Sequence, residues 1–172
     1  VSVGYDTLCR CSELSAMLVE NVRLHTDGTG RVLIPRSKAD VAGAGRIAHL
    51  SPNTARLLRD WLDEAGVTSG PLFRSLHMYR VADGPLATSS IRRLIKRATE
   101  SAGLDPALTA DLSGHSMRIG AAQDMMVAGF DALAIMQAGG WKSANVVLRY
   151  VENAATRELH ERRWERLARS TR

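Results

Sequence analysis

The sequence predicts an α+β fold that is mostly helical and carries a small three-stranded antiparallel sheet. Two observations support this prediction. Most apolar residues recur at helical spacing in segments bounded by serine, aspartate, proline or glycine. Three short segments near the amino terminus are instead rich in β-branched residues and lie close together in the chain. With 172 residues and 45% apolar content, the chain is long enough to bury its own core.

The first elements are expected to be one helix followed by the sheet. The chain opens at Val1 within a pattern of apolar residues that recurs at helical spacing as far as Leu18, and Arg10 falls inside this predicted helix. Three strands follow, at residues 19–24, 31–35 and 46–50, with a turn at 27–30 between the first two. Small residues at 37–45, among them Lys38, predict a mobile loop before the third strand.

The rest of the chain is expected to be helical apart from one long loop. Ser51 and Pro52 begin a helix that continues to Gly66. Residues 70–85 are interpreted as a loop anchored by Phe73, after which Thr88 or Ser89 caps a basic helix that ends at Gly103. Further helices are predicted at 116–128, 131–138 and 143–150, and the arginine-rich tail from 153 to 172 is also helix-prone.

Composition favours a nucleic-acid partner. The net charge is +5 and the isoelectric point is about 9.8, which suits a polyanion. Cys9 and Cys11 are too close in sequence for a sensible disulfide and have no partner cysteines for a zinc site, so both are expected to be reduced. No apolar run is long enough to cross a bilayer, and no signal peptide is visible, which predicts a cytoplasmic protein without a membrane partner.

Two arginines are suited to binding the phosphate of a DNA strand under attack. Attack builds negative charge on two non-bridging oxygens, and a guanidinium donates two hydrogen bonds without losing its proton. Arg118 is one candidate, three residues after His115 and therefore on the same face of a predicted helix. Arg10 is the other, although a structural ion pair with Glu13 is an alternative explanation for it.

A tyrosine follows these residues at a suitable distance. Tyr150 lies nine residues after Trp141, which itself follows a Gly-Gly pair. A phenol has a pKa of about 10 in peptides, so it needs neighbouring cations when it attacks, and Arg118 and His115 could supply that environment. Taken alone, Tyr150, His115 and Trp141 are each more simply explained by ordinary packing roles.

The remaining step is protonation of the departing 5′ oxygen. A lysine on a mobile loop can reach into a groove for this purpose, and Lys38 fits that description. No metal-ligand cluster, phosphate-binding glycine loop or pair of carboxylates accompanies these residues in the sequence. The sequence therefore predicts chemistry without a cofactor or a metal.

These motifs resemble the tyrosine recombinases, or phage integrases. The resemblance is carried by residues 112–126, by residues 135–141 with their Gly-Gly-Trp motif, and by residues 145–150, and it is weakest at 66–108. The spacing of 28 residues from Arg10 to Lys38 is also similar to that of the family's first arginine and its hairpin lysine.

The resemblance implies a role for each residue in cutting and rejoining DNA through a 3′-phosphotyrosyl intermediate, without metal or ATP. By this likeness Tyr150 is the nucleophile, Arg10 and Arg118 hold the phosphate, and Lys38 is the general acid. His115 and Trp141 complete the phosphate pocket, and Glu13 resembles the acidic residue that supports it.

The resemblance also implies an organisation. Residues 1–152 would form the catalytic domain and 153–172 a terminal helix that docks in its own core or on a neighbouring protomer. The family's amino-terminal core-binding domain is not found in this sequence, which looks cut from something longer. Double-stranded DNA is the expected partner, with a tetramer of full-length chains on DNA and, for a bacterial or phage protein, association with the nucleoid.

Two rival functions remain open at the level of sequence. A type IB topoisomerase has a similar site, but its pattern has lysine in place of His115 and histidine in place of Trp141, which favours a recombinase here. The other rival is a DNA-binding module that no longer cuts, either because it is degenerate or because a fragment cannot assemble the site.

Overall fold

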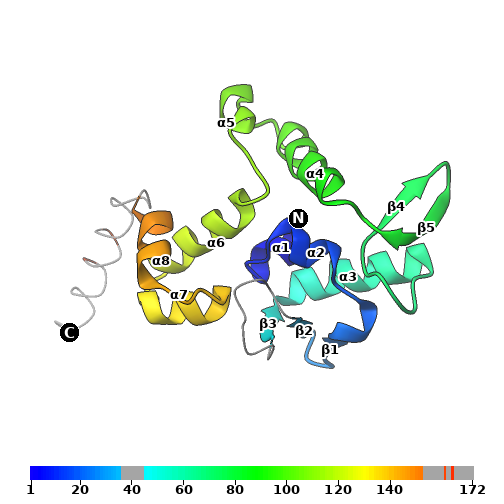
Figure 1. The fold of residues 1–172 in the computed structure, drawn as a ribbon, viewed down its shortest axis with the longest axis horizontal. Coiled ribbons are helices and arrows are strands. Elements are labelled where there is room, and N and C mark those ends of the chain that lie inside the picture. The colour runs from blue at the N-terminus through cyan, green and yellow to red at the C-terminus, as the bar shows by residue number, and fades with distance from the viewer. Residues whose placement is uncertain (36–44, 153–160, 162–163, 165–172) are drawn as a thin grey trace. The chain divides into compact units, whose positions relative to one another are not determined.

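The computed structural model describes residues 1–35, 45–152, 161 and 164 of the chain, and these fall into two compact units (Figure 1). The first unit covers Val1–Arg118 and the second covers Ile119–Arg172. The predicted fold class is confirmed, since helices predominate and a three-stranded antiparallel sheet lies near the amino terminus. None of the described helices is long and apolar enough to cross a lipid bilayer.

The predicted first helix is in fact two short helices, α1 (Ser2–Asp6) and α2 (Cys11–Ser15). The chain turns between them, where Leu8 adopts the left-handed conformation with φ 51°. Residues with a side chain rarely adopt this conformation, so a leucine gives no sign of a turn. The apolar spacing continues through the turn, and the sequence therefore predicts one continuous helix. Arg10 therefore precedes α2, as its capping residue, and does not lie within a continuous helix.

The sheet has the predicted order, with β1 (Val22–Leu24), β2 (Gly30–Ile34) and β3 (Arg46–Leu50) pairing antiparallel. The first strand is shorter than predicted because 19–21 form a single 3₁₀ turn. Burial alternates along β2, so one face of the sheet packs inward.

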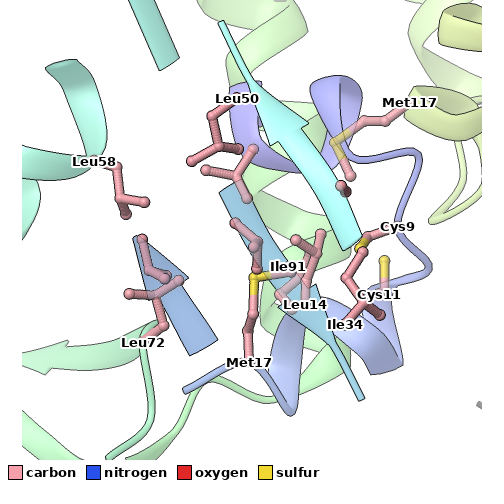
Figure 2. Packing of buried hydrophobic residues seen from close by; sticks show 14 of the residues in the cluster. Cys9, Cys11, Leu14, Met17, Ile34, Leu50, Leu58, Leu72, Ile91 and Met117 are labelled. Carbon is pink, nitrogen blue, oxygen red and sulfur yellow. The ribbon is translucent and has the colours of Figure 1, made fainter. Parts of the chain in front are cut away.

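The core of the first unit lies against this face (Figure 2). Helix α3 (Pro52–Ala65) contributes to it, and begins as predicted at Ser51, whose hydroxyl accepts from the Thr54 amide. The core residues labelled in Figure 2 come from α2 and the residues beside it, the sheet, α3 and later elements: Cys9, Cys11, Leu14, Met17, Ile34, Leu50, Leu58, Leu72, Ile91 and Met117.

The predicted loop at 70–85 is wrong, since it contains a second sheet of two strands, β4 (Arg74–His77) and β5 (Arg80–Pro85). Its turn residues, Met78 and Tyr79, both have positive φ. Two-residue hairpin turns of this kind are usually marked by Asn-Gly or Asp-Gly, and neither is present here. The turn therefore carried no sequence signal.

The basic helix α4 (Thr88–Ser101) begins without the predicted side-chain cap and is followed by a helix that was not predicted, α5 (Pro106–Ala110). The last three helices are close to their predicted bounds: α6 (Ser116–Val127), α7 (Ala132–Gly139) and α8 (Ala144–Val151). Asp131 caps α7 as predicted by accepting from the Ala134 amide. The predicted terminal helix at 153–172 lies largely outside the described residues.

Candidate active site

Arg10 and Glu13 form a closely bonded pair at the start of α2. The guanidinium of Arg10 donates from Nη1 to Oε1 of Glu13 at 2.7 Å, and the Arg10 backbone amide donates to the other carboxylate oxygen at 2.9 Å. The Glu13 side chain is 8% exposed, whereas that of Arg10 is 33% exposed. The predicted ion pair is therefore present, and it leaves part of the arginine accessible for an anion.

Arg118 is held against the turn that precedes Arg10. The residue is 1% exposed, and its Nη1 donates to the backbone carbonyl of Leu8. A buried charge of this kind has to be compensated by polar groups, and the turn supplies one of them. The two predicted phosphate-binding arginines are thus linked through the short segment from Leu8 to Arg10.

His115 lies in the turn immediately before α6 and not within the helix, which corrects the expectation that it shares a helical face with Arg118. Its backbone amide donates to the Ser113 hydroxyl at 3.2 Å, and its side chain is exposed. The preceding residue, Gly114, packs on Cys11, whose sulfur lies 3.5 Å from the Gly114 carbonyl oxygen. A Cβ at Gly114 would come within 2.6 Å of that sulfur, so this close approach requires glycine.

The first unit therefore gathers four of the predicted site residues. Arg118 contacts Leu8, and Gly114 contacts Cys11. Leu8 and Cys11 lie before and after Arg10 in the sequence, while Gly114 and Arg118 lie before and after His115. Residues more than a hundred positions apart in the sequence are brought together by these two contacts. Arg10, Glu13, His115 and Arg118 are accordingly neighbours within one compact unit.

The second unit holds the predicted nucleophile beside a tryptophan. The rings of Trp141 and Tyr150 have their centroids 5.8 Å apart and are tilted by 54°. Aromatic pairs prefer such offset or tilted arrangements. Tyr150 is half-buried and lies near the end of α8, and its backbone carbonyl accepts from the Gln123 side chain of α6 at 3.1 Å.

Gly139 explains part of the Gly-Gly motif. Trp141 is 7% exposed, and a Cβ built on Gly139 would overlap its ring. Only glycine fits beneath the indole, which in turn packs beside Tyr150. The motif that was predicted as a helix break is therefore also a packing requirement for the tryptophan.

Two further residues bear on the site. Lys38, the predicted general acid, lies outside the described residues. Arg46, which was not predicted as a site residue, lies 3.9 Å from Glu13 and donates to the Thr7 carbonyl at 2.6 Å. Its sequence signal was no more than a cation at the start of a strand, which is common on protein surfaces.

The two cysteines are buried and do not form a disulfide with each other. Burial raises the pKa of the Cys9 thiol to about 11, against the opposing effect of the Thr7 side chain and of Arg46. Burial also raises the pKa of Cys11, which Arg92 opposes. Since the thiolate is the reactive form, both are poor nucleophiles at neutral pH.

Helix α4, strand β4 and residues beside them line a groove that carries several arginines. Ile91 and Ile95 of α4 are buried, which leaves arginines and a lysine on its exposed side. The groove has a volume of about 940 Å³, and both apolar and cationic side chains line it. Its lining includes Trp61, Phe73, Leu86, Leu94, Arg74, Arg93 and Arg97.

The chain belongs to the phage integrase family, whose sequence model matches residues 1–157. It is similar to the Cre recombinase of Escherichia phage P1, with 36% identity over 170 residues that cover 89% of this chain and 48% of Cre. It is also 31% identical over 159 residues to an integrase/recombinase of Selenomonas ruminantium described as a XerD homologue, covering 88% of this chain and 46% of that protein. The chain thus spans about half the length of the curated relatives it matches.

Solved structures share the fold. The XerA recombinase superposes with a TM-score of 0.75 at 22% identity, covering 96% of this chain and 54% of XerA. XerH bound to its difH substrate superposes with a TM-score of 0.67 at 18% identity, covering 87% of this chain and 40% of XerH. At this level of identity, the comparison establishes the architecture alone.

Proposed function

We propose that this chain is the catalytic part of a site-specific tyrosine recombinase, which cuts and rejoins double-stranded DNA through a 3′-phosphotyrosyl intermediate. The observation that carries the proposal is the linkage of Arg10, Glu13, His115 and Arg118 within one unit. That set gives a phosphate two guanidinium groups in a partly buried environment, where charge stabilisation of the transition state is most effective.

In this mechanism the phenol of Tyr150 gives up its proton to solvent as its oxygen attacks the phosphorus of one DNA strand. The new bond joins phosphorus to the tyrosine oxygen, while the bond to the 5′ oxygen breaks and that oxygen takes a proton from Lys38. Arg10 and Arg118 stabilise the negative charge on the non-bridging oxygens, with His115 and Trp141 as further donors to the phosphate. The phosphodiester energy is kept in the tyrosine linkage, so the strand can be resealed without ATP.

The partner is double-stranded DNA, held in part by the basic side of α4 and the groove beside it. Phosphate contacts supply much of the affinity of such proteins and make it depend on salt. The XerH recombinase, which shares this fold, was solved bound to its difH substrate, and that complex agrees with the proposal. Assembly as a tetramer on DNA and a location at the nucleoid belong to the same proposal.

The test is covalent capture of DNA on Tyr150. Duplexes with a randomised segment and a nick within it are incubated with the chain, the mixture is denatured, and DNA that stays attached to protein is sequenced. We expect the unmodified chain to retain a defined set of sequences, with the protein on a 3′ end, and Tyr150→Phe to retain none. Equal recovery from both proteins would overturn the proposal.

The second candidate, a DNA-binding module that does not cut, is separated by the same experiment. DNA that shifts in a native gel but is never captured after denaturation would support it. A type IB topoisomerase is separated by relaxation of a supercoiled plasmid that lacks the captured sequence. A recombinase leaves that plasmid supercoiled.

A further inference from the structure

The turn between α1 and α2, which places the predicted phosphate-binding residue Arg10, has an unusual backbone conformation. Leu8 has φ 51°, which residues with a side chain rarely adopt, and Arg10 follows two residues later. Such a conformation persists only where surrounding contacts impose it, and it is often found next to functional residues. The contacts that impose it here also determine where Arg10 lies.

Two guanidinium groups hold the backbone of this turn. Arg118 donates to the Leu8 carbonyl, and Nη2 of Arg46 donates to the neighbouring Thr7 carbonyl at 2.6 Å. The same Arg46 nitrogen lies 3.6 Å from the Cys9 sulfur. Arg118 is one of the predicted phosphate-binding residues, whereas no role in the reaction has been assigned to Arg46.

Arg46 also faces the carboxylate that holds Arg10. Its Nη2 lies 3.9 Å from Oε2 of Glu13, the oxygen that accepts the Arg10 backbone amide, while Oε1 accepts the Arg10 guanidinium. Glu13 therefore has a cation on each side. The Arg46 side chain is 16% exposed, so this interaction is only weakly screened by solvent.

We propose that Arg46 is a positioning residue for the phosphate-binding site, a role that rests on the function proposed above. It fixes the Thr7 carbonyl and thereby the turn from which Arg10 projects. It also shares the negative charge of Glu13. With two cations on one carboxylate, the positive charge of Arg10 is only partly neutralised and stays available to the phosphate.

The location of Arg46 gives it a further connection to the site. It is the first residue of β3 and pairs with Ile34 at the end of β2, and in sequence it follows Lys38 by eight residues. One side chain thus joins the strand that follows the Lys38 segment to the helix that Arg10 caps. Substitution of Arg46 is accordingly expected to affect the cleavage step more than DNA binding.

The first experiment compares Arg46→Gln, Arg46→Lys and a matched control, Arg31→Gln. Arg31 is an exposed arginine on the outer face of the same sheet. The measurement is the single-turnover rate of covalent capture at saturating DNA, using a duplex recovered in the capture experiment. We expect Arg46→Gln to slow capture by about tenfold to a hundredfold, as small misplacements of a reacting group do. Arg46→Lys should recover part of the rate, and Arg31→Gln should match the unmodified chain.

A second substrate separates positioning from a merely structural role. A methylphosphonate at the scissile position lacks one charged oxygen, so the reaction depends less on the charge of Arg10. If Arg46 acts through Arg10, the penalties of Arg46→Gln and of an Arg10 substitution, measured side by side, should both shrink on this substrate. An equal penalty on both substrates, or no penalty on either, would overturn the proposal.

A third measurement needs no DNA. Nitrogen-15 spectra of the arginine side chains report how freely the Arg10 guanidinium rotates. In Arg46→Gln we expect faster rotation of that group than in the unmodified chain or in Arg31→Gln, at equal overall dispersion of the spectrum. An unchanged Arg10 signal would overturn the proposed positioning even where capture succeeds. An unmodified chain that never captures DNA would instead count against the proposed recombinase function.

Discussion

The two units of this chain hold the predicted site residues in different physical ways. In the first unit the predicted phosphate-binding residues are charged, and backbone carbonyls and a carboxylate hold them in place. In the second unit the predicted nucleophile is held by an aromatic neighbour and a backbone contact. Charged hydrogen bonds hold the residues of the first unit, whereas close packing around an aromatic ring holds those of the second.

This difference predicts different consequences of substitution. Arg10 can be replaced by lysine with little effect on folding, because the positive charge opposite the nearly buried Glu13 carboxylate is kept. Shape in the second unit cannot be altered at Gly139 without disturbing the packing of Trp141. Substitution of Arg10 should therefore lower mainly the rate of covalent capture, and substitution of Gly139 should lower mainly the free energy of unfolding.

The largest effect is expected for Arg10→Lys. A lysine keeps the charge but cannot donate two parallel hydrogen bonds to a phosphate, so the rate of covalent capture should fall by about a hundredfold to a thousandfold. The free energy of unfolding should change by less than about 1 kcal/mol, since a lysine keeps a positive charge beside Glu13 and the backbone amide at this position still donates to that carboxylate. Single-turnover capture and denaturant unfolding measure the two quantities. A loss of rate matched by a large loss of stability would break the comparison.

The next effect concerns Gly139→Ala in the second unit. The added Cβ would overlap the Trp141 ring, and overpacking of this kind costs about 1–3 kcal/mol. Gly120→Ala is the matched control, because a Cβ there meets nothing within 4 Å inside helix α6. Replacing a helical glycine with alanine should stabilise by about 0.5–1 kcal/mol. Denaturant unfolding of both variants measures the two effects, and equal effects would contradict the packing argument.

An effect confined to high pH is expected from Cys9 in the first unit. Its pKa is raised by burial to about 11 in the folded chain, so the folded state keeps its proton while the unfolded state loses it. The contribution to stability is complete below the unfolded pKa and is lost as pH rises from about 9 to about 11, amounting to about 3 kcal/mol. Cys9→Ser should flatten this part of the pH dependence of unfolding relative to the unmodified chain. If the free energy of unfolding fell equally with pH in both proteins, the raised pKa of Cys9 would be contradicted.

The smallest effect is expected at the groove that carries several arginines. Arg97 lines the groove beside α4 and is exposed. Arg97→Gln should weaken DNA binding a fewfold on all sequences and reduce the salt dependence of affinity by about one counterion. Titration of captured and unrelated duplexes at several salt concentrations tests this, with Arg31→Gln for comparison. An unchanged salt slope would remove α4 from the proposed DNA interface.

Much of the architecture could be predicted because its signals are local. Ser51 with Pro52 and Asp131 are helix-start signals that act within a few residues, and both begin helices as predicted. The three strands of the sheet were also visible as short segments rich in β-branched residues. The β4–β5 hairpin was missed because its turn, Met78-Tyr79, has positive φ without the residues that usually mark it.

For the site, the sequence by itself determined which residue types are present and at what spacing, and the family resemblance assigned their roles. Only the tertiary structure decided that Arg10 precedes a helix after a left-handed turn, and that the turn is held by Arg118 and Arg46. Contacts between residues more than thirty positions apart leave no periodic trace in the chain. They depend on how separate elements pack, and the role of Arg46 could therefore be inferred only after the fold was known.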